Sequence, residues 1–136
     1  MATILLSIKP EYVDRIFNGS KKYEFRKHLP QAKVDKLVVY STDPVQRVVG
    51  EVEVLGSLTM KPTPLWEATK QLAGISRVKY RAYFKGCSTA SAFQLGQTKL
   101  YESPKTLEEI GIKNAPQSFV YLNTDLDKRY CKRLIV

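Results

Sequence analysis

Hydrophobic and polar residues alternate along several short stretches of this chain, which predicts β-strands rather than long helices. Near the N-terminus, for example, Ile4, Leu6 and Ile8 fall on one side of an extended backbone. Between such stretches the spacing of apolar residues becomes helical. The strand segments that we expect cover residues 4–9, 21–26, 37–40, 45–58, 90–101 and 119–122.

Helices are predicted where the apolar spacing changes to three and four residues and where residues typical of helix ends flank the segment. The first helix spans residues 10–18, because Pro10 suits a first helical position and Gly19 suits the residue that ends a helix. The other predicted helices begin after the caps Thr63, Ser76 and Thr106 and end at Gly74, before Gly86 and at Gly111.

About six strands and three or four short helices predict an α+β domain built around a small β-barrel. Gly50 and Gly56 interrupt the longest strand, and glycines there permit the bulges or bends that barrel closure needs. Close approach of another backbone is the alternative reason for either glycine. The third helix carries Tyr80, Tyr83 and Phe84 on one face, which is more typical of core packing than of a ligand site.

Composition places the chain among ordinary globular domains. With 136 residues, 43% of them hydrophobic, we expect one domain over residues 1–136, with a basic C-terminal extension at 123–136. No apolar run approaches the roughly 20 residues that span a membrane, and the start lacks signal-peptide features, so we expect a cytoplasmic protein with no membrane partner. Cys87, Cys131 and His28 are too few for a zinc site, and nothing in the sequence predicts a metal or other cofactor.

The net charge indicates a polyanionic partner. Twenty-two Lys and Arg residues against 13 Asp and Glu give a formal charge of +9, and nucleic acid is the commonest intracellular polyanion. Basic residues gather within residues 21–28 and again within 128–133, where Tyr130 lies among them. Aromatic residues among cations suit base stacking beside phosphate contacts. Many small proteins are basic for solubility alone, and the charge does not distinguish RNA from DNA.

Residues 19–26 concentrate the candidate chemistry in one segment. Glu24 and Arg26 are two residues apart on the predicted strand, so they share a face and can form a charge-assisted pair or hold one ligand together. Lys21 lies where the chain enters the strand, and it can reach the same place despite its opposite parity. The plain alternative is a solvated edge strand with a weak surface ion pair.

All four residues of the G-x-K-x-x-E-x-R signature of the ASCH domain family, a branch of the PUA-like superfamily, are present within residues 19–26. The chain resembles that family over most of residues 3–122, with residues 62–86 as a variable insert. The resemblance implies a small β-barrel with a cleft beside the first helix and the signature strand, and it implies that the cleft binds RNA or nucleotides. The residues that would carry over to the cleft are Ser7, Lys9, Lys21, Glu24 and Arg26.

The chemistry of these side chains fits such a ligand. Lys21 and Arg26 can neutralise phosphate or hold a carbonyl oxygen, and Glu24 can accept from an exocyclic amine, as carboxylates do from cytosine N4. Tyr40, near a strand end, can stack on a base, although packing in the core is the alternative for this residue. The first hypothesis is therefore a non-enzymatic module whose cationic cleft binds RNA, a nucleotide or a nucleoside.

An enzyme is the second hypothesis. One ASCH branch is an amidohydrolase that removes the acetyl group of N4-acetylcytidine, and the resemblance makes Lys21 and Glu24 the candidate catalytic residues. That branch has threonine at the position of Glu24 and uses a later glutamate as acid or base, for which Glu51 and Glu53 are the candidates here. A carboxylate beside Lys21 favours its charged form, which favours binding over nucleophilic attack. The family also includes nucleases, so ribonuclease activity stays open.

A protein-interaction role is the third hypothesis. The apolar residues 134–136 and the aromatic helix could form a contact surface, including one for a homo-oligomer.

Overall fold

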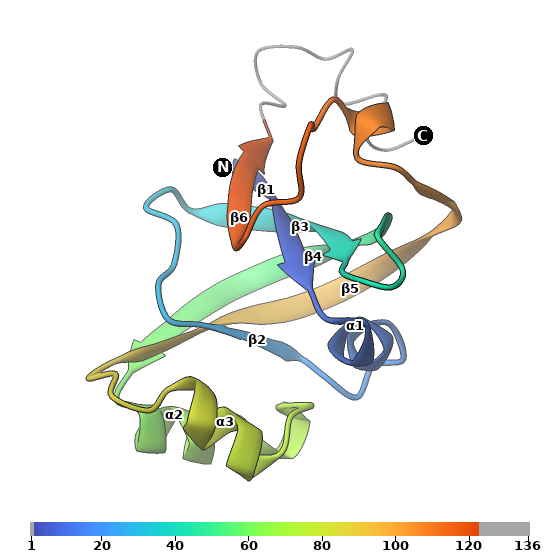
Figure 1. The fold of residues 1–136 in the computed structure, drawn as a ribbon. Helices are drawn as coiled ribbons and strands as arrows, with labels where there is room; N and C mark the ends of the chain where they lie inside the picture. The colour runs from blue at the N-terminus through green and yellow to red at the C-terminus, as the bar shows by residue number, and fades with distance from the viewer. Residues whose placement is uncertain (1, 123–136) are drawn as a thin grey trace.

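The computed structural model describes residues 2–122, which form one six-stranded sheet with short helices packed against it (Figure 1). The strand order is β2-β5-β4-β3-β1-β6; β1 and β3 are parallel, and the other neighbours are antiparallel. The strands are β1 (Ala2–Ile8), β2 (Tyr23–Arg26), β3 (Val34–Ser41), β4 (Arg47–Met60), β5 (Ala90–Lys105) and β6 (Phe119–Leu122). The helices are α1 (Pro10–Phe17), α2 (Pro62–Thr69) and α3 (Arg77–Tyr83), with 3-10 turns η1 (Lys70–Leu72) and η2 (Glu108–Ile110).

The alternation of β1 determines which residues enter the core on each side of the sheet. Ile4, Leu6 and Ile8 pack with Val13 and Ile16 of α1 in the main core, whose members are all buried. The residues of opposite parity face a second cluster beside η2, which contains Leu5, Val38, Tyr40, Val48, Tyr101, Ile110 and Leu122. A third cluster lies between β2, β5 and the α2–α3 pair and contains Phe25, Leu65, Ala73, Tyr80, Phe84, Ala90 and Ala92. The α2–α3 pair therefore has its own apolar contact with the sheet, at the end where β2 lies (Figure 1).

The predicted closure into a barrel is wrong. Within residues 2–122, β2 and β6 form the two edges of the sheet and do not pair with each other. The glycines in β4 act locally instead. The pairing register shifts beside Gly50 and beside Gly56, and a Cβ on Gly50 would lie 2.5 Å from the carbonyl oxygen of Lys99 and 2.7 Å from the Phe17 ring. Both reasons predicted for these glycines, a bulge in the strand and the close approach of another backbone, are therefore found in β4, although the sheet does not close.

Most helix ends follow the predicted signals. Helix α1 begins at Pro10 and is followed by Gly19 with φ of +89°, and the side chain of Ser76 caps α3 by accepting from the backbone N–H of Lys79 at 3.2 Å. Thr106 and Glu109 form the expected capping box. No helix among the residues that the structure describes is long and apolar enough to span a bilayer.

Several element boundaries, among them the end of α2 at Thr69 rather than at Gly74, and one burial prediction differ from expectation. Helix α2 begins at Pro62 rather than Pro64, β3 begins earlier at Val34, and β5 continues to Lys105, because its end pairs with Val48 of β4. Tyr80 and Phe84 are core residues, but Tyr83 is 37% exposed. The predicted extension at 123–136, its basic cluster and the apolar end lie outside the described residues.

Candidate functional site

A cleft of about 910 Å³ lies beside α1 and β2. Its walls come from the end of β1, the start of α1, β2, the turn after β3, the inner face of α3 and residues 115–117 before β6. All six residues predicted to bind a ligand line it: Ser7, Lys9, Lys21, Glu24, Arg26 and Tyr40. The fold thus brings together residues from three strands and the start of a helix.

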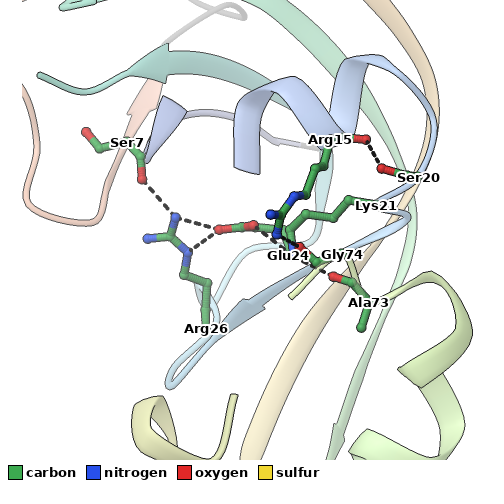
Figure 2. A network of polar contacts seen from close by, with 8 residues as sticks. All are labelled: Ser7, Arg15, Ser20, Lys21, Glu24, Arg26, Ala73 and Gly74. Carbon is green, nitrogen blue, oxygen red and sulfur yellow. Dashed lines mark hydrogen bonds and ion pairs between the residues drawn. The ribbon is translucent and has the colours of Figure 1, made fainter. Parts of the chain in front are cut away.

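Lys21 is the most deeply buried cation of the cleft, with 2% of its surface exposed. Its backbone N–H donates to the carbonyl of Arg15, so the chain is still leaving α1 and strand parity does not yet apply. The Nζ atom donates to the carbonyl oxygen of Ala73 at 2.7 Å (Figure 2) and lies 4.9 Å and 5.3 Å from the ring centroids of Phe25 and Tyr12. Cation–π contacts of this kind stabilise a desolvated ammonium group.

Burial lowers the pKa of the Lys21 ammonium group from its ordinary value of 10.5 to about 8. The carboxylate of Glu24, whose Oε1 lies 3.9 Å from Nζ, opposes this shift because it favours the charged form. Arg15 and Arg26 add to the lowering by repulsion. Desolvation therefore outweighs the ion pair, and a fraction of Lys21 is neutral near neutral pH.

Glu24 and Arg26 form a buried ion pair rather than a solvated surface pair. Glu24 is 6% exposed, and its Oε2 accepts from both Nε and Nη2 of Arg26 at 3.1 Å and 2.8 Å. The same Nη2 donates to the carbonyl oxygen of Ser7 at 2.8 Å, so Arg26 joins β2 to the end of β1 (Figure 2). Both donors use one carboxylate oxygen, which leaves the other oxygen of Glu24 for different partners.

That second oxygen, Oε1 of Glu24, is an acceptor available to a ligand. It accepts no hydrogen bond from the described residues. It lies 3.9 Å from Lys21 Nζ, and the Glu24 side chain keeps 8% of its surface accessible where it lines the cleft. A donor that enters the cleft can therefore bind Glu24 without displacing Arg26.

The connection between α2 and α3 closes one side of the site, which sequence reasoning missed. Besides Ala73, the carbonyl of Gly74 accepts from Arg15 Nη1 at 2.9 Å (Figure 2). The carbonyl of Leu72 accepts from the backbone N–H of Lys22 at 2.8 Å. Gly74 has φ of +65°, and a Cβ there would clash with the Cβ of Lys21. The only signal in the sequence was Gly74 itself, which we interpreted as a helix end.

The other predicted residues differ in how free they are. The hydroxyl of Ser7 donates to the carbonyl of Pro116 at 2.7 Å, so it holds the loop before β6. Lys9 is exposed at the start of α1. Tyr40 is 7% exposed and packs in the second core cluster, so the core alternative describes most of its surface although it touches the cleft. Of these three, Lys9 has the freest side chain.

Glu51 and Glu53 are not in the cleft, so the hypothesis that either assists Lys21 is wrong. Glu51 accepts from the hydroxyl of Tyr101 at 3.0 Å and pairs with Lys36 at 3.4 Å, while Glu53 accepts from the backbone of β5. The register of β4 is fixed by its antiparallel pairing with β3 and β5. That pairing places both glutamates away from the cleft. The cleft carboxylates that sequence reasoning missed are Glu11 and Asp43.

Metal ligands are sparse in the same region. Among residues 2–122, no group of three or more His, Cys, Asp or Glu side chains is arranged to hold a metal ion.

Comparison with known proteins agrees with the signature around Lys21. The family model described as "ASCH domain" matches residues 6–110, which is most of the chain. The chain belongs to the ASCH domain family. The signature Gly19, Lys21, Glu24 and Arg26 lies within the matched range of this ASCH domain.

Sequence relatives of this ASCH domain carry varied names. An ASCH domain-containing ribonuclease of Zymomonas mobilis is 32% identical over 92 residues, covering 67% of this chain and 62% of that protein. Two proteins of Ureaplasma parvum align over 88% of this chain: one named ATP synthase subunit alpha, 32% identical, and one named large ribosomal subunit protein uL22, 31% identical. The chain spans only 15% and 39% of the lengths of these two.

Solved structures place the fold in the same family. The crystal structure of an ASCH protein from Zymomonas mobilis superposes with a TM-score of 0.86 at 27% identity and covers 98% of this chain and 93% of that one. The N-terminal domain of McrB from Staphylothermus marinus reaches a TM-score of 0.53 at 12% identity, over 98% of this chain and 84% of that domain. The second likeness concerns the fold alone.

Proposed function

We propose that this ASCH domain binds RNA, through a nucleotide held in the cleft beside α1 and β2. The observation that carries the proposal is the cluster of Lys21, Glu24 and Arg26, which lines the cleft and leaves one carboxylate oxygen of Glu24 without a hydrogen bond from the described residues. The cleft volume of about 910 Å³ falls within the roughly 300–1,000 Å³ of small-molecule sites. The name of the Zymomonas mobilis relative supports RNA as the ligand class.

Each part of a nucleotide has a suitable partner in the cleft. Glu24 Oε1 can accept from an exocyclic base amine, and the rings of Tyr12 and Tyr83, which line the cleft, offer surfaces for stacking. Lys9, exposed at the mouth, can contact phosphate. Binding at this site does not require that the Lys21 ammonium group leave the carbonyl of Ala73.

Charge reversal at the mouth tests the proposal. We expect Lys9→Glu to weaken binding of a labelled single-stranded RNA about tenfold in fluorescence anisotropy, since a charge-assisted contact contributes about 1.5–3 kcal/mol. Lys99→Glu is the matched control, because Lys99 is exposed on β5 outside the cleft and its replacement changes the net charge equally. Equal affinities for the two variants would remove the cleft from RNA binding.

Base preference tests the role of Glu24. Cytidine presents an exocyclic amine and uridine a carbonyl oxygen, so we expect an oligocytidine to bind more tightly than an oligouridine of equal length, by about 1–3 kcal/mol for each base read. Competition of the two against one labelled RNA measures the difference. A preference for oligouridine would contradict acceptance by Glu24.

Ribonuclease activity is the second candidate function, and the lowered pKa of Lys21 favours it. With a pKa of about 8, about a tenth of Lys21 is neutral at pH 7 and can take a proton from a ribose 2′-hydroxyl. That oxygen would attack the neighbouring phosphorus, the bond from phosphorus to the 5′-oxygen would break, and the leaving oxygen would take a proton from the protonated Lys21 or from water, so that a 2′,3′-cyclic phosphate and a free 5′-hydroxyl remain. Arg26 can stabilise the charge that develops on the phosphate.

Incubation of RNA with the protein and a metal chelator tests this candidate. Cleavage that rises with pH toward about 8, and that is lost in Lys21→Met but kept in Lys99→Met, is the expected result. Intact RNA would exclude the activity and leave binding. N4-acetylcytidine in a parallel tube tests the amidohydrolase alternative by release of cytidine. Homo-oligomerisation and a cytoplasmic location stay predictions.

A further inference from the structure

We propose that a second pocket, between α2 and α3, binds another part of the same single-stranded RNA. The proposal rests on RNA binding in the cleft and extends it across α3. The pocket, of about 480 Å³, is lined by three aromatic residues, Trp66, Tyr80 and Phe84, and three cations, Arg77, Arg81 and Lys85. Only Ala82 lines both this pocket and the cleft.

Aromatic rings form the floor of the pocket. Tyr80 and Phe84 are 2% and 3% exposed, and Trp66 is partly exposed beside them, with its ring centroid 4.9 Å from that of Tyr80. The hydroxyl of Tyr80 donates to the carbonyl of Pro62 at 2.7 Å, which fixes the ring and leaves no polar group of Tyr80 unpaired. Trp66, the partly exposed ring of this floor, offers a surface for stacking of an unpaired base, and the buried rings of Tyr80 and Phe84 support it from below.

Cations form the rim. Arg77, Arg81 and Lys85 follow one another at intervals of four residues, so they lie along one side of α3 and its C-terminal end, and all three are exposed. None of them has a carboxylate within 4.0 Å in the part of the chain that the structure describes. Glu67 of α2 is already paired with Lys70 at 2.7 Å. A row of unpaired cations beside an aromatic floor matches a phosphate backbone with a stacked base.

Helix α3 connects the two sites. Its other side contributes Lys79 and Tyr83 to the cleft, and Ala82 lies between the two sites. A helix with its side chains is about 10–12 Å across, so one nucleotide cannot occupy both sites. The occupant that fits both is therefore a strand of several nucleotides crossing α3. An acidic peptide could meet the cations, but its carboxylates would not use the stacking surface.

Binding of RNAs of increasing length tests the second pocket. We expect Arg77→Glu with Arg81→Glu to leave the affinity for the shortest RNAs unchanged and to weaken long RNAs about tenfold. The matched control is Lys33→Glu with Lys99→Glu, which changes the net charge equally at exposed positions outside both sites. Equal affinities of the two double variants for long RNA would overturn the proposal.

Trp66 provides a second readout without any substitution in the core, because it is the single tryptophan of the chain. Long RNA should quench its fluorescence, the shortest RNAs should not, and the Arg77→Glu, Arg81→Glu variant should lose the quenching. Unchanged fluorescence with saturating long RNA would overturn stacking in this pocket. Quenching by polyglutamate but not by RNA would overturn it in favour of a protein partner.

The two proposals can fail separately. If Arg77→Glu with Arg81→Glu weakens long RNA no more than its control does, while Lys9→Glu still weakens binding, RNA binding at the second pocket is excluded and RNA binding in the cleft is kept. If Lys9→Glu matches Lys99→Glu at every RNA length, the cleft fails and the shared strand fails with it.

Discussion

At the scale of single residues, burial and one distant backbone group determine the state of Lys21. It meets Glu24 and Arg26 in one cleft, as the pattern of residues 19–26 predicted. The partner that holds Nζ, the carbonyl of Ala73, is 52 residues away and is a backbone atom, so no side-chain pattern could reveal it. The burial that lowers the Lys21 pKa likewise depends on the α2–α3 segment. Residues 19–26 supply the charges of the site, and tertiary packing determines the protonation of Lys21.

The lowered pKa of Lys21 predicts that the protein becomes more stable between pH 8 and pH 10. The unfolded chain holds its proton up to about 10.5 and the folded chain only to about 8, so in this range the unfolded state binds more protons and the free energy of unfolding rises with pH. The rise from Lys21 is about 2 kcal/mol. Urea unfolding at several pH values should show it for the wild-type protein.

The Lys21→Met variant is the comparison, because it lacks the titrating group. Its free energy of unfolding should change less over the same range, while Lys99→Met should follow the wild type. Above pH 10 the raised pKa values of Tyr80 and Tyr101 add their own protonation changes, so the comparison ends there. Parallel curves for wild type and Lys21→Met would contradict the lowered pKa.

At the scale of elements, local sequence signals were sufficient to predict a helix end that carries its own cap. They were insufficient where pairing between distant strands determines the structure. Ser76 and the Thr106–Glu109 box were predicted correctly because each cap bonds within four residues. Barrel closure was not predictable, because the glycines of β4 permit bending but do not determine whether β2 meets β6. The full extent of β5 was hidden for the same reason, since its last residues are ordered by pairing with Val48.

The connection between α2 and α3 makes a prediction at this scale. Gly74→Ala should destabilise the protein more than Gly86→Ala, by about 1–3 kcal/mol. Both residues have positive φ, so both substitutions strain the backbone, but only the new Cβ at position 74 meets a neighbour, the aliphatic stem of Lys21. Urea unfolding of the two variants measures the difference. Equal decreases in the free energy of unfolding would mean that the α2–α3 connection shifts to accommodate the new Cβ without disturbing Lys21.

At the scale of the whole molecule, the charge of +9 attracts any polyanion, and the positions of the cations determine where it binds. Sequence placed one basic cluster near residue 26 and another within 128–133. The structure adds a third group, Arg77, Arg81 and Lys85, whose common orientation exists only once α3 has formed. Each test variant and its control therefore carry the same net charge. A non-specific effect of charge would weaken RNA binding equally in both.

Thermal unfolding with and without RNA separates binding by the folded domain from binding by the charged chain. A ligand that binds only the native state stabilises it by RT ln(1 + [L]/Kd), which is about 2.7 kcal/mol at a concentration one hundredfold above Kd. RNA held in the cleft and across α3 requires both sites to be assembled, so we expect long RNA to raise the melting temperature. The shortest RNAs, compared at equal concentration, should raise it less, because they reach one site only.

The Lys9→Glu and Arg77→Glu, Arg81→Glu variants should each reduce the shift produced by long RNA, and Lys33→Glu with Lys99→Glu should leave it near that of the wild type. If anisotropy detected tight binding while the melting temperature stayed constant, the RNA would be bound equally by folded and unfolded chains. Binding would then follow from charge along the sequence, with no role for the sites that the fold assembles.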